Sequence, residues 1–137
     1  MVQFYLLSVL SLILAGALAA SGFLTERIAS FAALSDLAER RSVATTVGVL
    51  ALAIGILKFF VRAPGDGVAV VGDLLPAVAG IVTGGVLLLA QQHRPGERDP
   101  EFPRSRTQML VEYRDPIGLA GLLVGLLHFL FPATVIL

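Results

Sequence analysis

The sequence predicts an all-α integral membrane protein, a single domain built as a bundle of four transmembrane helices. Three observations predict this class. The 137-residue chain is 56% hydrophobic and 15% charged, whereas soluble domains are about 45–50% apolar and about 25% charged. Its mean hydropathy is +0.87. It also contains four separate apolar stretches, each close to the about 20 residues that a helix needs to cross a bilayer.

The four predicted spans cover residues 2–24, 43–61, 74–91 and 116–137. We expect helices because the bilayer core offers no hydrogen-bond partner to backbone N–H and C=O groups. The first stretch ends in small residues that resemble a signal-peptide cleavage site. No Lys or Arg precedes it, however, so we expect it to be retained as a span.

The ends of the third and fourth spans carry helix-start signals. Asp115 followed by Pro116 is typical of an N-cap and a first helical residue. Asp73 is expected to cap the third span, with Pro76 in its first turn. The apolar residues 68–72 allow two interpretations, an interfacial segment or the beginning of a longer third span.

Two longer connections, residues 25–42 and 92–115, lie on one side of the predicted membrane. In the first, apolar residues recur near helical spacing, which is typical of a short helix at the membrane interface. It either contacts the membrane or a partner, or simply joins two spans. In the second, residues 92–105 are expected to be extended and residues 106–114 helical. This connection is either a solvated connector or the docking segment for a cytoplasmic partner.

The arginines predict the orientation. Basic residues gather in loops on the cytoplasmic side of membrane proteins. Both long connections are therefore expected to be cytoplasmic, with both termini outside, in a bacterial inner membrane. The basic residues of these connections are Arg27, Arg40, Arg41, Arg94, Arg98, Arg104, Arg106 and Arg114.

Small residues four positions apart recur in every predicted span. Such pairs let helix backbones approach closely, and in lipid this packing, rather than the hydrophobic effect, drives helices together. The pairs in the third and fourth spans are strict Gly-x-x-x-Gly motifs. We predict helix contacts at these positions, within one bundle or between chains. The predicted packing residues are Gly16, Ala20, Gly48, Gly55, Gly80, Gly84, Gly121 and Gly125.

His128 lies near the middle of the fourth span, where an ionisable group is costly and often functional. Pro132, four residues later, cannot donate a hydrogen bond to the His128 carbonyl, which predicts a hinge. Two interpretations stay open for His128. It is either a proton or ion site, or a neutral side chain that bonds to a neighbouring helix, for example at Thr83.

Lys58 lies about one turn from the end of the second span. Its aliphatic stem allows the ammonium to reach the interface, or the ammonium pairs with an acid such as Asp73. A site for a substrate anion is the third interpretation. The candidate polar membrane site consists of His128, Thr83, Lys58 and Asp73.

The sequence lacks the motifs of the common catalytic and cofactor sites. The chain has no Cys, which excludes disulfides and Cys-based metal sites. It has two His residues and no metal-protease or phosphate-loop motif. Ten basic and ten acidic residues balance, without the basic face that nucleic-acid binding requires. We therefore expect no catalytic residue, cofactor, metal or nucleic acid, and the lipid bilayer as the main partner.

Three function classes follow. The leading hypothesis is a small non-enzymatic membrane protein that acts through helix–helix assembly, as an accessory, scaffold or homo-oligomeric component. The second is a small oligomeric channel or transporter for an ion or small solute, with His128 near the pathway. The third, a membrane enzyme, lacks a catalytic set in the sequence.

Overall fold

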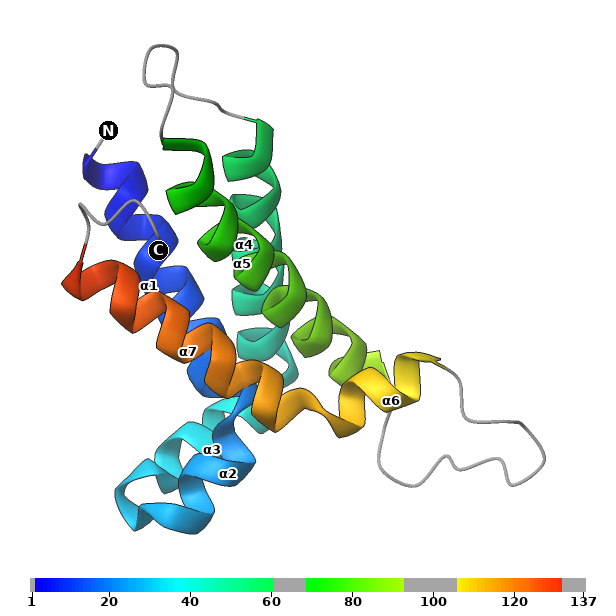
Figure 1. The fold of residues 1–137 in the computed structure, drawn as a ribbon. Helices are drawn as coiled ribbons and strands as arrows, with labels where there is room; N and C mark the ends of the chain where they lie inside the picture. The colour runs from blue at the N-terminus through cyan, green and yellow to red at the C-terminus, as the bar shows by residue number, and fades with distance from the viewer. Residues whose placement is uncertain (1, 61–68, 93–105, 132–137) are drawn as a thin grey trace.

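The structure is a computed structural model that describes residues 2–60, 69–92 and 106–131. Within these ranges it is all-helical and has no strand, which confirms the all-α part of the predicted class. Figure 1 shows the long helices packed together, with the short helices α2, α3 and α6 at one end. The elements are α1 (Val2–Ala19), α2 (Ser21–Arg27), η1 (Ala29–Phe31), α3 (Ala32–Glu39), α4 (Arg41–Phe60), α5 (Ala69–Gln92), α6 (Arg106–Glu112) and α7 (Arg114–Leu130).

Two helices are long and apolar enough to cross a membrane, over Arg41–Lys58 in α4 and Leu74–Gln92 in α5. A third candidate span is a bent pair, Gln3–Ala19 of α1 with Ser21–Arg27 of α2, whose two parts are inclined by 69°. The 17 residues of α7 are fewer than the about 20 that a bilayer crossing needs. The described residues thus contain two or three candidate spans, where the sequence predicts four.

The bend between α1 and α2 lies inside the predicted first span, residues 2–24. Ala20 leaves the helical conformation, with φ −87° and ψ 12°, although the stretch contains no Pro. Ser21 and Gly22 follow directly, and helices often bend at such a Gly/Ser pair. Gly118 of α7 packs so closely on Ala20 N and Ala19 that even a Cβ at Gly118 would clash. The predicted span is therefore two helical segments, and α2 turns away from the axis of α1.

The helix starts predicted at Asp73 and Asp115 are wrong. The helix α5 already begins at Ala69, so residues 69–72 belong to it, Asp73 lies within it and Pro76 is an interior proline. The helix α7 begins at Arg114, and Asp115 lies in its first turn. Since Pro116 has no N–H to donate, the helical path breaks one turn earlier, which separates α6 from α7 at Tyr113.

The helices α4 and α5 form an antiparallel pair that meets at glycines. A Cβ at Gly84 would lie 2.6 Å from the carbonyl oxygen of Gly48, and one at Gly55 would lie 2.8 Å from that of Ala77. At Gly80 the nearest atom is the carbonyl oxygen of Ala51, 3.1 Å away. No residue larger than glycine fits at Gly84 or Gly55 without a backbone shift.

The helices α1 and α7 form a second antiparallel pair. A Cβ at Gly16 would lie 2.5 Å from Leu122 N, and one at Gly125 would lie 2.9 Å from Cγ1 of Ile13. Gly121 instead faces α5, where its Cβ would meet the side chain of Thr83. All the predicted packing residues therefore lie at contacts between helices of the same chain.

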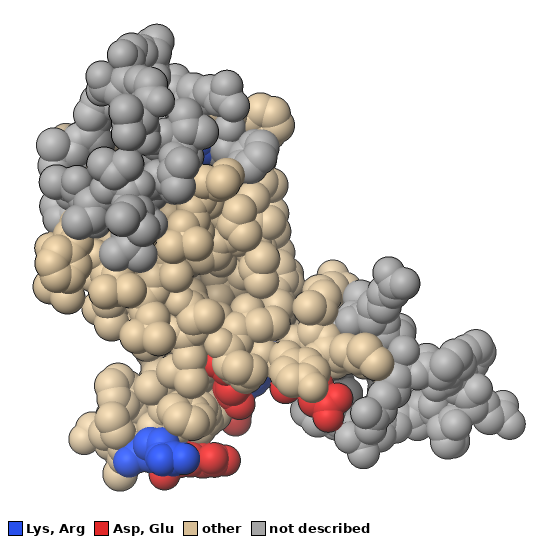
Figure 2. Space-filling model, viewed as in Figure 1, with Lys and Arg blue, Asp and Glu red and all other residues tan. Residues whose placement is uncertain are grey.

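The surface of the bundle is apolar along the long helices and charged at one end (Figure 2). Large apolar side chains are exposed along the long helices, for example Leu7, Leu14, Val49, Leu57, Val78, Val82, Leu123 and Phe129. On the face shown in Figure 2, blue and red side chains gather at the end that carries α2, α3 and α6, and the bundle beside them is tan. Such a distribution is typical of a helix bundle that lies in lipid with one polar end.

Candidate functional site: a polar pocket between the helix pairs

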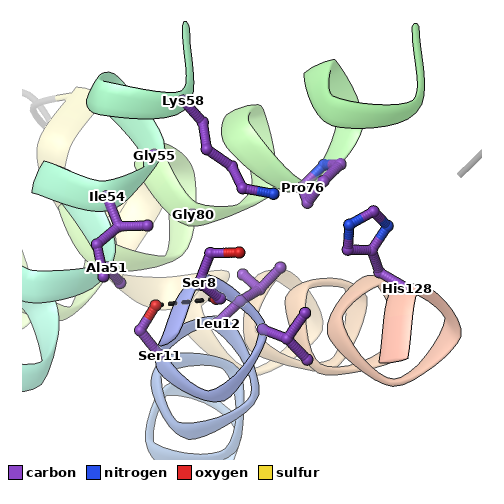
Figure 3. Close-up of a pocket in the computed structure, with 11 residues that line it drawn as sticks. Ser8, Ser11, Leu12, Ala51, Ile54, Gly55, Lys58, Pro76, Gly80 and His128 are labelled. Carbon is purple, nitrogen blue, oxygen red and sulfur yellow. Dashed lines mark hydrogen bonds between the residues drawn. The ribbon is translucent and has the colours of Figure 1, made fainter. Parts of the chain in front are cut away.

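A small pocket lies between the α1–α7 pair and the α4–α5 pair (Figure 3). The pocket has a volume of about 10 Å³, which is close to the space that one water molecule needs. Four polar residues line it, namely Ser8, Ser11, Lys58 and His128. The rest of the lining is apolar and includes Leu12 and Pro76.

Two serines of α1 provide one side of the pocket. The hydroxyl of Ser8 donates to the carbonyl oxygen of Tyr5 at 2.9 Å, and that of Ser11 donates to the carbonyl oxygen of Ser8 at 2.9 Å. Both side chains are buried. Because each hydroxyl proton is used within α1, the serine oxygens present acceptor lone pairs to the pocket.

Lys58 enters the pocket from α4. Figure 3 shows its side chain reaching past Gly55 toward Pro76 and Ser8. The ammonium nitrogen lies 6.0 Å from the centre of the Tyr5 ring, a distance at which a cation is attracted by the ring face. Lys58 thus adds hydrogen-bond donors opposite the serine acceptors.

His128 enters from α7 and is only 5% exposed. Its ring lies 5.2 Å from that of Tyr5, tilted by 49°. The Tyr5 hydroxyl donates a hydrogen bond to the carbonyl oxygen of His128. This is the carbonyl to which Pro132 cannot donate, so a side chain of α1 replaces the missing helical bond. Pro132 itself, the predicted hinge, lies outside the described residues.

The other two predicted site residues are not placed in the pocket by the described structure. Thr83 is fully buried, and its hydroxyl donates to the carbonyl oxygen of Ala79 in its own helix. It packs on Gly121, away from the pocket lining. For Asp73 the structure describes the helical backbone only. Of the four candidates, Lys58 and His128 are brought together.

Sequence reasoning missed Tyr5, Ser8 and Ser11. The signal was present, because these three polar residues recur at three-residue spacing in a span that is otherwise apolar. That spacing places them on one helix face. The pattern is easily overlooked because Ser is tolerated in apolar helices, where its hydroxyl bonds to a backbone carbonyl of the preceding turn.

The pocket offers groups that can bind a small polar molecule. A small polar molecule would find donors on Lys58 and acceptors on the two serines, next to the imidazole of His128. Among the residues that the structure describes, no three His, Cys, Asp or Glu side chains group to hold a metal ion. The pocket therefore suits one water or a molecule of similar size.

Comparisons with known proteins give a family but no activity. No curated protein and no solved structure matches this chain. The sequence model of a protein family of unknown function matches residues 1–128. That match covers more than half of the 137 residues. The chain therefore belongs to this family of unknown function.

Proposed function

We propose that this chain is a non-enzymatic integral membrane protein that acts through helix–helix assembly, as an accessory, scaffold or homo-oligomeric component. One observation carries the proposal. The glycines of the four long helices make close contacts between helices of the same chain. The large apolar side chains are therefore left on the outer surface. Such a surface is compatible only with lipid or with other membrane helices.

The proposal includes a fourth crossing by α7. The helix packs antiparallel to α1, and its outward side chains are apolar, including Leu123, Leu126 and Phe129. His128 faces the interior instead. The arginines of the two long connections support a cytoplasmic position for the end that carries α2, α3 and α6. The beginning of α1 and the end of α7 would then lie outside the inner membrane.

Cysteine labelling tests this topology cleanly because the chain contains no Cys. Single variants Gln3→Cys, Ser30→Cys, Glu112→Cys and Phe131→Cys would be treated with a membrane-impermeant maleimide. We expect the first and last to react in intact cells, and the other two only after permeabilisation. Reaction of Glu112→Cys and Phe131→Cys from the same side would contradict the crossing by α7.

Assembly is tested in lipid nanodiscs and in native membranes. A homo-oligomer would give a defined multiple of 14.4 kDa by native mass spectrometry. A photo-crosslinking residue at the outward position Leu50 would report a partner in native membranes, with the buried Ala51 as the matched control. A monomer in nanodiscs, together with no cross-link from Leu50 or another outward position, would contradict the proposal.

A channel or transporter for an ion or small solute is the second candidate, and the polar pocket favours it. Lys58, His128, Ser8 and Ser11 meet inside an apolar bundle, where polar groups are costly and often functional. Proton flux into vesicles that contain the purified protein tests this candidate. We expect His128→Ala to change the flux and Phe129→Ala, on the outer face of the same helix, to leave it unchanged. Equal flux in both variants would remove the pocket from the pathway.

A further inference from the structure

We propose that residues 21–39 form an interfacial hairpin, made of α2, η1 and α3, whose apolar side chains insert among lipid acyl chains. The bilayer is the one that α4 crosses, so the inference rests on the membrane crossing in the proposed function. It adds a lipid-binding surface that the crossing helices do not provide.

The chain holds this hairpin at the membrane surface. Only Ala20 separates it from α1, and only Arg40 separates it from α4. The candidate span of α4 begins directly afterwards, at Arg41. With connections of one residue at each end, the hairpin cannot move far from the plane in which both helices end.

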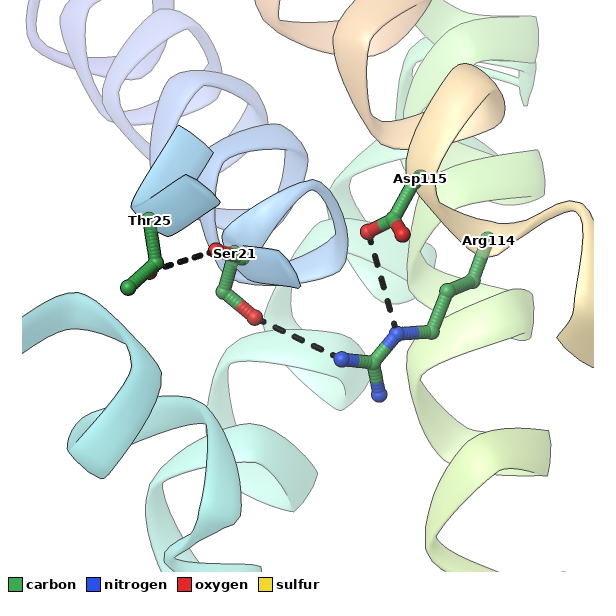
Figure 4. Close-up of polar contacts among 4 residues, drawn as sticks. All are labelled: Ser21, Thr25, Arg114 and Asp115. Atoms are coloured by element: carbon green, nitrogen blue, oxygen red, sulfur yellow. Dashed lines mark hydrogen bonds and ion pairs between the residues drawn. The ribbon is translucent and has the colours of Figure 1, made fainter. Parts of the chain in front are cut away.

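The bend directs α2 across the membrane surface. A helix inclined by 69° to α1 lies nearer to the membrane plane than to its normal, provided that α1 runs along the normal. Figure 4 shows the polar contacts at this junction. The Arg114 guanidinium donates to the Ser21 hydroxyl at 3.5 Å and so connects α7 to α2, while Thr25 donates to the Ser21 carbonyl at 2.7 Å within α2.

The carboxylate of Asp115 adds a steric contact to this junction. A Cβ at Gly22 would lie 3.1 Å from Oδ2 and 3.2 Å from Oδ1 of Asp115. The side chain also lies 4.0 Å from the Arg114 guanidinium, measured between Oδ1 and Nε. The beginning of α7 therefore holds the beginning of α2 in place, so the hairpin has a fixed orientation.

The hairpin exposes more large apolar side chains than a water-facing connection requires. Phe23 is 36% exposed, Ile28 47%, Phe31 38% and Leu37 41%. In α3, Leu34 and Ala38 face the core of the bundle, while Asp36 and Glu39 occupy the opposite side of the helix. The exposed apolar side chains of the hairpin are thus left for lipid, and helices at a membrane interface bury such side chains about 5–10 Å deep.

The hairpin and the two arginines that follow it carry no net charge, so they favour neither anionic nor cationic lipid. Over residues 21–41, Glu26, Asp36 and Glu39 balance Arg27, Arg40 and Arg41. The Arg27 guanidinium lies 5.2 Å from the centre of the Phe23 ring, so this arginine covers an aromatic face while its charge can stay among headgroups. Insertion is therefore driven by apolar area, and zwitterionic lipid is sufficient.

Tryptophan fluorescence tests the inference, because the chain has no Trp. Full-length Phe31→Trp and Phe23→Trp would be reconstituted in phosphatidylcholine vesicles, with or without bromine near the top of the acyl chains. We expect both residues to emit at shorter wavelength than Trp in water, and to lose fluorescence in brominated vesicles. Aqueous iodide should quench them weakly.

Two further variants make the result decisive. Asp36→Trp, on the opposite side of the hairpin, should be quenched by iodide and not by bromine. Leu50→Trp, on the outer face of α4, should be quenched by brominated lipid and reports whether the protein crosses the membrane at all. If only Leu50→Trp is quenched by bromine, the hairpin proposal is overturned, whether iodide reaches the hairpin tryptophans or a protein contact shields them. If Leu50→Trp also escapes quenching by bromine placed at any acyl depth, the membrane crossing itself is contradicted.

Discussion

At the scale of single residues, Tyr5 links the two ends of the sequence. Its hydroxyl donates to the carbonyl of His128, which a following proline leaves without its usual partner. Tyr5→Phe removes this donor and should lower stability by about 1 kcal/mol. Thermal unfolding in detergent measures the change. Tyr113→Phe, at a side chain that is 62% exposed, is the control, and an equal effect of both variants would contradict the role of the buried bond.

Two neighbouring glycines of α5 provide a second prediction at this scale. A Cβ at Gly84 would lie 2.6 Å from the Gly48 carbonyl oxygen, whereas one at Gly85 has its nearest neighbour 3.9 Å away. Gly84→Ala should therefore destabilise the protein by about 1–3 kcal/mol, because the α4–α5 backbones must separate. Gly85→Ala should be neutral or stabilising, since Ala is the better helix former by about 1 kcal/mol. The melting temperatures of the two variants give the comparison, and a Gly84→Ala protein as stable as Gly85→Ala would show that the contact is not tight.

At the scale of elements, α7 packs closely against the bend at Ala20. Gly118 leaves no room for a side chain against Ala20 and Ala19. Gly118→Ala should push α2 away from α7 and expose the backbone of the junction. Hydrogen exchange measured by mass spectrometry should then be faster in residues 20–27, with the middle of α4 unchanged. Ala120→Ser, at an exposed position two residues further along α7, should leave exchange unaltered, and similar exchange in both variants would show that the contact at Gly118 does not hold this junction.

At the scale of the whole molecule, the apolar outer surface determines whether the protein stays in the membrane or dissolves in water. The α1–α7 and α4–α5 pairs, each packed closely at glycines, enclose the polar pocket between them. Their outer faces are apolar. Because so much apolar surface is costly in water, the protein should stay in the membrane pellet after alkaline carbonate treatment and should dissolve in detergent. Release by carbonate alone would contradict an integral membrane protein.

The sequence by itself determined the helical class and most helix positions. Long apolar runs without partners for the backbone can only be helical in lipid, and the predicted spans at 43–61 and 74–91 correspond to α4 and α5. The spacing of Gly48, Gly55, Gly80 and Gly84 also indicated contact positions, because small residues four apart occupy one helix face. Lys58 and His128 were identifiable because an ionisable group in an apolar run stands out.

Only the tertiary structure decided which helices pair, where the first span bends and which polar residues meet. The Ser21-Gly22 pair marks a place where a helix can bend, but the close contact of the bend with Gly118, almost a hundred residues away in the sequence, could not be read from any local pattern. Thr83 bonds to its own backbone and packs on Gly121, while Ser8 and Ser11 line the pocket and Tyr5 contacts His128. Local propensity fixes a helix and its faces, but the partner of each face depends on close contacts between distant segments, and these exist only once the helices are packed.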